Sequence, residues 1–582
     1  MGSGKSRRLS AAAAAAALAG LTLLAACTGG SSSSSSSTAS VTTASASPGE
    51  APASGSGSAS PAPAEDAQGA AEAAARNPGA VPGIPTDEAR VAAAIDQVDG
   101  LAQSIFDKSA LPGMAVAVVH DGRTVFTKGY GVRKIGAPET VDADTVFQLA
   151  SLSKPLGATV VAKEVGAGTV TWDTPVVKNL PDFTLADPYV TANVTIADLY
   201  SHRSGLPNHA GDDLEDLGYD RTEILRRLQY LPLNPFRAVY NYTNYGLTAG
   251  AESVAAAAGT DWATLSERDV YGPLGMTSTS SNYADFAAAP NHASGHVKID
   301  GAYAADYLRD PDRQSPAGGA SSSVKDFATW MTMVLAGGQA PDGSQLIDGQ
   351  ALRAALTPTM RQADGSPVPQ SVDGRAGIYG YGFGVSNDAS GRVRLAHSGA
   401  FGAGAGTAFM LIPDLDLGIA VFSNATAEGS PEAITNSFAD LAEFGAVQQD
   451  WYTIYRNALA GITAPTGELV GQTPPANAVP AAADSAYVGT YASDYFGPAT
   501  VSESNGTLVL TAGPKNHTFT LTHWDGDVFT LEPVGDRSAT DPAGENVDDG
   551  SISKVTFERS GDIATAVTVE AWDKEGMGTF RR

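Results

Sequence analysis

The chain has 582 residues, enough for more than one domain and for a large buried core. Its formal net charge of −27 at pH 7 argues against nucleic acid or an anionic membrane surface as a partner, since both would repel it. One cysteine and eight histidines without paired spacing provide neither a disulfide nor a recognisable metal site, so we expect no metal and no cofactor.

The N-terminal residues have the features of an export signal. Basic residues precede an apolar run over 11–26 that is too short and too rich in alanine for a membrane span. The run ends in Leu24-Ala25-Ala26-Cys27, which resembles the lipobox of bacterial lipoproteins, where the cysteine becomes the lipid-bearing N-terminus. We expect 1–27 to be a lipoprotein signal and Cys27 to anchor the protein outside the cytoplasm, on the bacterial cell membrane. The alternative is an ordinary secreted protein with a stray cysteine.

Residues 28–85 are rich in Ser, Ala, Gly and Pro, a composition that cannot bury a core. We expect a disordered tether of about 40 Å average end-to-end distance. Ordered sequence begins near Thr86, where 87–109 has helical periodicity. The apolar run 114–119 and the turn at 120–122 then predict a β-hairpin, and a helix before a hairpin and a long mixed region indicates α+β layers.

Ser151 and Lys154 form a Ser-x-x-Lys pair between an apolar run and a helical pattern that continues to Val165. A serine in the first turn of a helix has its lysine one turn on, on the same face. The helix N-terminus and burial both lower a lysine pKa, which gives the hydroxyl a nearby base. The alternative is a serine cap with a solvated lysine, and the same spacing recurs at Ser322/Lys325 and Ser551/Lys554.

Two later segments carry further polar side chains. We expect His202 to be a buried histidine that holds a loop, rather than a base. Tyr242 and Asn244 are two positions apart, so they point the same way in an extended segment. A tyrosine beside a lysine ammonium can have its pKa lowered enough to accept a proton, and an asparagine suits an acyl amide. The alternative for this segment is tyrosine-rich packing.

A strand over 392–395 leads into Ala396-His397-Ser398-Gly399-Ala400, and two more strands are expected over 407–412 and 417–422. A glycine on a strand often lets another backbone or a ligand come close. The order Ser-x-x-Lys, Tyr-x-Asn, His-Ser-Gly resembles that of serine β-lactamase-like hydrolases, the group of class C β-lactamases, D-alanyl-D-alanine carboxypeptidases and related esterases.

The resemblance covers about 90 to 445 and implies an antiparallel sheet flanked by helices, plus a helical region. It implies that Ser151 is the acylated nucleophile, and that Lys154 and Tyr242 share its proton and relay it to the leaving group. It also implies the groups that bind substrate: Asn244 for the acyl side chain, the backbone of Ser151 and Ala400 beside Gly399 for the oxyanion, and His397 for a carboxylate or the proton network.

Two departures from the family pattern matter. His397 stands where the β-lactamases of this group usually carry lysine, although histidine is common in the carboxypeptidases and esterases. Asn234-Pro235-Phe236-Arg237 replaces the usual Pro-Gly-Thr before Tyr-x-Asn. The histidine lowers the expectation of efficient antibiotic hydrolysis without excluding it.

After the hydrolase domain at 86–445, we expect a connecting helix and linker over 446–484 and a β-domain over 485–582. Short strands with turns at 504–506 and 525–527 predict a small antiparallel barrel or sandwich, similar to the β-domain often appended to these hydrolases. The polar stretch 536–550 is expected to be an exposed loop.

The sequence therefore predicts an extracytoplasmic serine acyl hydrolase, most simply a D-Ala-D-Ala or D-amino-acid peptidase or an esterase. Its partners would be small acyl substrates (peptides, esters or β-lactams, cell-wall peptides included) and a membrane reached through the lipid anchor. A class C-type β-lactamase and a non-catalytic penicillin- or peptidoglycan-binding lipoprotein are the alternatives. The complete serine, lysine, tyrosine and asparagine set argues for the enzyme, and the sequence does not predict the oligomeric state.

Overall fold

The computed structural model describes residues 82–299, 301–307, 309–362, 376–533 and 550–582. Cys27, the tether up to residue 81 and most of the loop expected over 536–550 lie outside these residues. Within the described ranges, no helix has the length and apolar character needed to cross a membrane.

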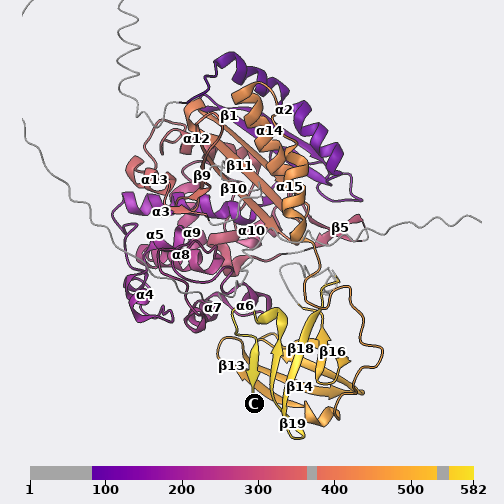
Figure 1. Ribbon diagram of the computed structural model, residues 1–582. Coiled ribbons are helices and arrows are strands. Elements are labelled where there is room, and N and C mark those ends of the chain that lie inside the picture. Colours follow the sequence, from indigo (N-terminus) through magenta and orange to yellow (C-terminus); the bar gives the residue numbers. More distant parts are fainter. Residues whose placement is uncertain (1–81, 300, 308, 363–375, 534–549) are drawn as a thin grey trace, which may run out of the picture. The chain divides into compact units, whose positions relative to one another are not determined.

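An eight-stranded antiparallel sheet is the centre of the N-terminal part, in the order β2-β1-β12-β11-β10-β9-β8-β7 (Figure 1). Its strands are β1 (Gly113–His120), β2 (Arg123–Gly131), β7 (Met360–Arg361), β8 (Ile378–Tyr379), β9 (Gly384–Asn387), β10 (Val393–Phe401), β11 (Ala405–Ile412) and β12 (Leu417–Ser423). The expected hairpin is the β1–β2 pair, and Asp121 at its turn has a positive φ of 51°. β1 pairs along its length with β12, from Met114 opposite Ser423 to His120 opposite Leu417.

Strand β1 is buried on both of its faces because helices cover both sides of the sheet. Met114 and Val116 pack with residues of α2 (Glu88–Ser109) and α14 (Ser430–Phe444) in one cluster. Ala115 and Ala117 face the opposite side and belong to the cluster that contains α3 (Ser153–Gly166) and α12 (Val324–Leu335). This alternation follows from the two-residue period of a strand and explains why 114–119 is apolar throughout.

The expected helix over 87–109 is α2, and its N-cap is Asp87, whose side chain accepts from the backbone N–H of Arg90. Further helices form the region beside the sheet: α4 (Pro188–Asn193), α5 (Ile196–Tyr200), α6 (Asp212–Asp216), α7 (Arg221–Arg227), α8 (Asn244–Ala258), α9 (Trp262–Ser266), α10 (Tyr283–Ala288), α11 (Ser315–Gly318) and α13 (Gly349–Leu356). Two short strand pairs complete it: β3 (Phe147–Gln148) with β6 (Ser321–Ser322), and β4 (Gly295–Ile299) with β5 (Ala302–Tyr307).

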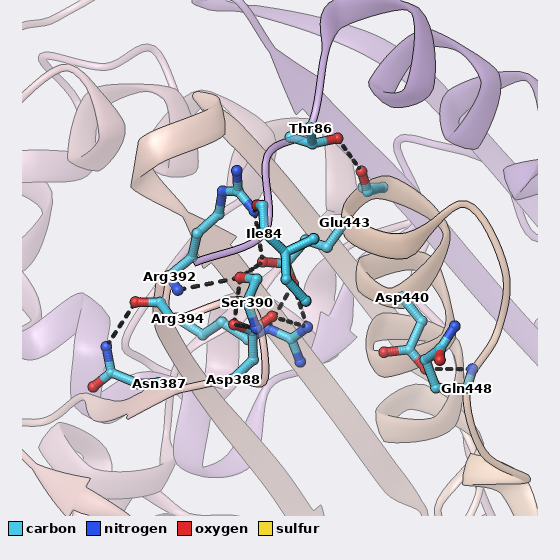
Figure 2. A network of polar contacts seen from close by, with 12 residues as sticks. Ile84, Thr86, Asn387, Asp388, Ser390, Arg392, Arg394, Asp440, Glu443 and Gln448 are labelled. Atoms are coloured by element: carbon cyan, nitrogen blue, oxygen red, sulfur yellow. Dashed lines mark hydrogen bonds and ion pairs between the residues drawn. The ribbon is translucent and has the colours of Figure 1, made fainter. Parts of the chain in front are cut away.

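A buried polar network holds the first described residues to the sheet (Figure 2). Arg394 on β10 binds Glu443 of α14 through Nε at 3.1 Å and binds Asp388 through Nη2 at 2.8 Å. Arg392 donates to the backbone oxygen of Ile84 at 3.1 Å. Through Arg392, this network of paired charges ties the segment before α2 to the sheet.

Helix α15 (Trp451–Leu459) follows the sheet-covering helix α14, and the C-terminal part is a closed antiparallel barrel of eight strands (Figure 1). They are β13 (Gly489–Ser493), β14 (Gly497–Ser504), β15 (Thr507–Ala512), β16 (His517–Asp525), β17 (Val528–Leu531), β18 (Ser553–Ser560), β19 (Ile563–Val569) and β20 (Thr579–Arg581). The predicted α+β class is confirmed, and of the two alternatives for the β-domain the barrel is observed. Strand β14 was not expected, because it begins with Gly497 and Pro498, which are uncommon in strands, and its last three residues are exposed and polar.

Candidate active site

Ser151 lies between β3 and α3, in a single 3-10 turn over Ala150–Leu152. The sequence placed Ser151 in the first turn of the helix. In the structure it lies in the 3-10 turn immediately before the helix, since α3 begins at Ser153. Ala150 has a φ of 47°, a left-handed conformation that is uncommon for a residue with a side chain. Such strain is typical of functional sites, and here it turns the chain sharply just before the serine.

Lys154 on α3 is fully buried and its ammonium group has three hydrogen-bond acceptors around it. Nζ lies 3.1 Å from Ser151 Oγ, 2.8 Å from Asn244 Oδ1 and 2.9 Å from the backbone oxygen of Ala317. Burial lowers the pKa of Lys154 to about 7, and the negative charge of Asp212 opposes that shift. The lysine can therefore be neutral near physiological pH, which a general base requires.

Tyr242 also reaches the nucleophile, from the segment before α8. Its hydroxyl donates to Ser151 Oγ at 2.8 Å, and Lys154 Nζ lies 4.5 Å from the centre of its ring. The expectation that the lysine lowers the tyrosine pKa is wrong, because burial raises the pKa of Tyr242 well above its usual value. A phenolate removed from water is costly, and this cost is the main cause of the raised pKa of Tyr242. Tyr242 is a neutral proton donor here.

Asn244, the first residue of α8, connects Lys154 to a carboxylate that the sequence did not indicate. Its Nδ2 donates to Asp212 at 3.1 Å while its Oδ1 accepts from Lys154. Asp212, at the start of α6, also lies 2.9 Å from Nδ1 of His209. The backbone N–H of His209 donates to the oxygen of Tyr242 at 2.8 Å. Asp212 thus orients the amide and adds a negative charge beside the buried ammonium.

His397 lies on β10 and contacts a second residue that the sequence did not indicate. Its Nε2 is 2.7 Å from the hydroxyl of Tyr379 on β8, and its Nδ1 is 2.6 Å from the backbone oxygen of Ser398. Neither Asp212 nor Tyr379 belongs to a short motif. Only the order of neighbouring strands, which brings β8 close to β10, could have indicated Tyr379.

Strand β10 packs directly against the backbone of the nucleophile. A Cβ on Gly399 would lie 2.3 Å from the oxygen of Leu149 and 3.0 Å from the nitrogen of Ser151, so only glycine fits. Ala400, the next residue, pairs with Gly406 of β11. This packing brings the two backbone segments expected to form the oxyanion hole, at Ser151 and Ala400, next to one another.

His202 is buried and its Nδ1 accepts from the backbone N–H of Thr243 at 3.2 Å. Its ring lies 4.5 Å from that of Tyr242, and its backbone oxygen accepts from Asn241 at 2.8 Å. Burial holds the pKa of His202 well below its usual value. These contacts agree with the predicted loop-holding role.

The two other Ser-x-x-Lys pairs have no such surroundings. Ser322 is buried in β6 against Thr279, and Lys325 is exposed and paired with Asp144 at 2.7 Å. Lys554, at the start of β18, is paired with Glu468. Both pairs are structural, as expected.

The site thus combines a serine hydroxyl, a buried lysine that can be neutral, a tyrosine hydroxyl and a close backbone strand. The family profile "Beta-lactamase" matches residues 91–444, more than half of the chain. The chain belongs to the beta-lactamase family. It is a serine hydrolase of that family, and a second profile, a domain of unknown function named DUF3471, matches residues 473–578, the barrel.

Curated relatives of this beta-lactamase-family chain include several hydrolases. The "Unguisins hydrolase ungD'" of Aspergillus campestris is 33% identical over 44% of this chain and 49% of its own length, so the chain spans about half of that relative. The "Unguisins hydrolase ungD" of Aspergillus violaceofuscus is 27% identical over 72% of this chain and 80% of its length. The "D-alanyl-D-alanine-carboxypeptidase/endopeptidase AmpH" of Escherichia coli is 26% identical over 56% and 82%.

Among solved structures, the octameric penicillin-binding protein homologue from Pyrococcus abyssi is similar to 84% of this chain and 100% of its own. Its TM-score is 0.53 and its sequence is 17% identical. At this level of identity the likeness shows the fold alone, and it agrees with the sheet and flanking helices described above.

Replacing Tyr242 by phenylalanine is expected to lower the acylation rate by about 10²–10⁴-fold, the usual contribution of a positioned proton-transfer group. The change removes the tyrosine hydroxyl that donates to Ser151 Oγ but leaves the ring in its aromatic cluster. The melting temperature should therefore stay near that of the wild type. Stopped-flow acylation by a p-nitrophenyl ester measures the effect. His202→Ala is the contrast, with a lower melting temperature but normal turnover per folded molecule. A folded but inactive His202→Ala beside an unimpaired Tyr242→Phe would contradict these roles.

The pH dependence should carry the signature of Lys154. Because the neutral amine is the base and its pKa is lowered to about 7, acylation should rise with pH through that value. Asp212 raises the pKa of Lys154, so Asp212→Asn should move this limb to lower pH. Asp220→Asn is the matched control, because asparagine caps α7 as well as aspartate does and, among the described residues, Asp220 binds the backbone N–H of Glu223 rather than a residue of the site. If the acylation rate of Asp212→Asn rises at the same pH as that of the wild type, a group other than Lys154 determines the pH dependence.

Proposed function

We propose that this protein hydrolyses small acyl substrates through an acyl-enzyme on Ser151. The observation that carries the proposal is the set of acceptors around Lys154. Asn244 Oδ1 and the oxygen of Ala317 can only accept, so each takes one N–H of the amine. In the neutral lysine the remaining direction, toward Ser151 Oγ, holds the lone pair. The nitrogen is therefore aimed at the serine proton.

The steps follow from this arrangement. Lys154 takes the proton as Ser151 Oγ bonds to the substrate carbonyl carbon, and the oxyanion is held by the backbone of Ser151 and Ala400. Tyr242, a neutral donor on Oγ, gives its proton to the leaving group as the old bond breaks and is reprotonated from the ammonium of Lys154. Water then repeats the sequence and releases the acid, with Lys154 again as base.

The substrate class that we propose is a D-amino-acid peptide or an ester. Support comes from the relatives, one named a carboxypeptidase/endopeptidase and one, the "Esterase EstB" of Burkholderia gladioli, named an esterase; the latter is 32% identical over 25% of this chain and 41% of its length. An asparagine beside the nucleophile suits the amide of an acylated amino acid.

A substrate panel on the purified full chain tests the proposal. It should contain p-nitrophenyl esters, D-amino-acid amides, acylated D-Ala-D-Ala peptides and a chromogenic cephalosporin. Protein inactivated beforehand by a fluorophosphonate is the control for contaminating hydrolases. Turnover of esters or D-amino-acid derivatives, lost on inactivation, is the expected result. Turnover of the cephalosporin alone would favour a β-lactamase, and binding without turnover of any member would favour a non-catalytic role.

We also propose that the protein acts outside the cytoplasm, held to the membrane by lipid on Cys27. The support is the lipobox-like Leu24-Ala25-Ala26-Cys27 and the Ser/Ala/Gly/Pro-rich stretch that follows it. Cys27→Ser is expected to move the protein from the membrane fraction into the medium. Mass spectrometry of the N-terminal peptide should find a diacylglyceryl group in wild type alone. Unchanged detergent partitioning of the variant would contradict the anchor.

A further inference from the structure

The turn between β13 and β14 of the barrel contacts the hydrolase part at the start of α6. The hydroxyl of the buried Tyr495 donates to Asp213 Oδ1 at 2.8 Å and accepts from the backbone N–H of Gly211 at 3.1 Å. Gly211 and Asp213 are the chain neighbours of Asp212 on its two sides. A single hydroxyl group of the barrel therefore bridges the two residues that flank a carboxylate of the active site.

This turn is held from both sides. Arg227 of α7 donates to the backbone oxygen of Tyr495 at 2.6 Å, and the hydroxyl of Tyr219 donates to the backbone oxygen of Phe496 at 2.6 Å. On the barrel side, the ring of Phe496 lies 4.7 Å from that of Tyr495 and 5.7 Å from that of Trp572. A side chain whose neighbours are fixed in this way can hold a partner in a defined position.

Apolar packing surrounds the same contact. Leu214 and Leu217 of the hydrolase part belong to one buried cluster with Phe496 of the barrel. A Cβ on Gly513 of the barrel would lie 2.4 Å from the backbone oxygen of Leu217, so backbone packs directly against backbone here. Because the contact is apolar and closely packed, we expect the turn to keep its place beside α6.

The position of Asp212 matters for the chemistry of the site. Its carboxylate accepts from Asn244 Nδ2 at 3.1 Å, and its charge raises the pKa of Lys154 against the effect of burial. Helix α6 has only five residues and therefore little stability of its own, so bonds from outside the helix determine where Asp212 lies. At the turn into α6, Gly211 has a φ of 91°, and its N–H finds an acceptor in the barrel.

We propose that the barrel completes the active site, with Tyr495 as a positioning residue that holds Asp212, and through it the amide of Asn244, in place. This inference rests on the proposed acyl-enzyme chemistry, and it gives a role to the part of the chain that matches a domain of unknown function. The barrel would then act on the reaction without touching the substrate.

Tyr495→Phe in the full chain tests the inference, because it removes the hydroxyl and keeps the ring beside Phe496. We expect acylation by a p-nitrophenyl ester to be about 10-fold slower or more, since a small displacement of a group that orients the base costs rate. A displaced Asp212 would also stabilise the ammonium of Lys154 less. The rise of acylation with pH should therefore move to lower pH, as in Asp212→Asn. Stopped-flow acylation between about pH 5 and 9 measures both effects.

Tyr219→Phe is the matched control, because it removes a hydroxyl that binds the same turn at Phe496 rather than the neighbours of Asp212. It should lower the melting temperature and leave the acylation rate and its pH dependence as in wild type. Asp213→Ala and Asp213→Asn form a second comparison, since both remove the same charge. Only the amide oxygen of asparagine can still accept from Tyr495, so Asp213→Asn should be slowed less than Asp213→Ala.

A folded Tyr495→Phe with the wild-type rate and pH dependence would overturn the inference and leave the proposed function intact. Equal slowing in Tyr495→Phe and Tyr219→Phe would also overturn it, since any loosening of the barrel would then have the same effect. Equal rates in Asp213→Ala and Asp213→Asn would do so whether or not Tyr495→Phe folds. A wild-type protein that neither turns over the ester nor takes a fluorophosphonate label on Ser151 would instead remove the proposed function, and this inference with it.

Discussion

Ser151→Ala is expected to abolish covalent labelling by a fluorophosphonate or a fluorescent penicillin and to stop turnover of every substrate. The change removes the hydroxyl oxygen that Lys154 and Tyr242 both contact, at 3.1 and 2.8 Å. Without it no acyl-enzyme can form, and the remaining groups have no atom to activate. Intact-protein mass spectrometry after incubation with the probe measures the result directly.

The other two Ser-x-x-Lys serines are the matched controls, because each has a lysine at the same spacing. Ser322→Ala and Ser551→Ala should be labelled as fast as wild type, since Lys325 and Lys554 are paired with carboxylates instead of facing their serines. Labelling that survives in Ser151→Ala and disappears in Ser322→Ala would show that Ser322, and not Ser151, is the nucleophile.

Lys154→Met is expected to lower the acylation rate by more than about 10⁴-fold. This is beyond the largest rate contribution usual for a single general base. Methionine keeps the length and burial of the side chain but cannot accept a proton. It also leaves Asn244 Oδ1 and the oxygen of Ala317 without their donor, so the amide loses its orientation. Single-turnover acylation, followed by stopped flow at pH 8, measures the rate.

Lys163→Met is the control for this change, because Lys163 lies on the same helix and binds the backbone oxygen of Leu346, at 2.9 Å, instead of a residue of the site. It should acylate at the wild-type rate. Acylation of Lys154→Met within 10-fold of wild type would show that another group accepts the serine proton, and a thermal melt would establish that both variants are folded.

The local features of this chain could be predicted because each has a local cause. Asp87 caps α2, and the turn after His120 takes positive φ, so the helix and hairpin are visible in a few residues. Ser151, Lys154, Tyr242 and Asn244 were found because they form short motifs whose spacing reflects chemistry. Their convergence, with three hydrogen bonds at Lys154, is what the motif order indicated.

The remaining features depend on tertiary placement. Asp212 stands in an acidic stretch that looks like an ordinary solvated helix start, and only the approach of α6 to α8 brings it to Asn244. Tyr379 lies on β8 and reaches His397 only through the order of the strands in the sheet. The pKa of Tyr242 was predicted in the wrong direction because burial cannot be weighed against a neighbouring charge until both are located.

The pairing of β1 with β12 has a consequence for how activity develops during folding. Met114 is opposite Ser423, so within the sheet the first strand of the hydrolase part pairs with its last strand. Contacts this distant in the chain close late and slowly. During synthesis β1 has to wait for almost the whole domain before its partner exists. The nucleophile needs Gly399 beside it, and that strand joins the sheet through β11 and β12. Partly made chains should therefore carry Ser151 without being able to acylate it, and the return of acylation in a refolding experiment should follow the slowest structural phase.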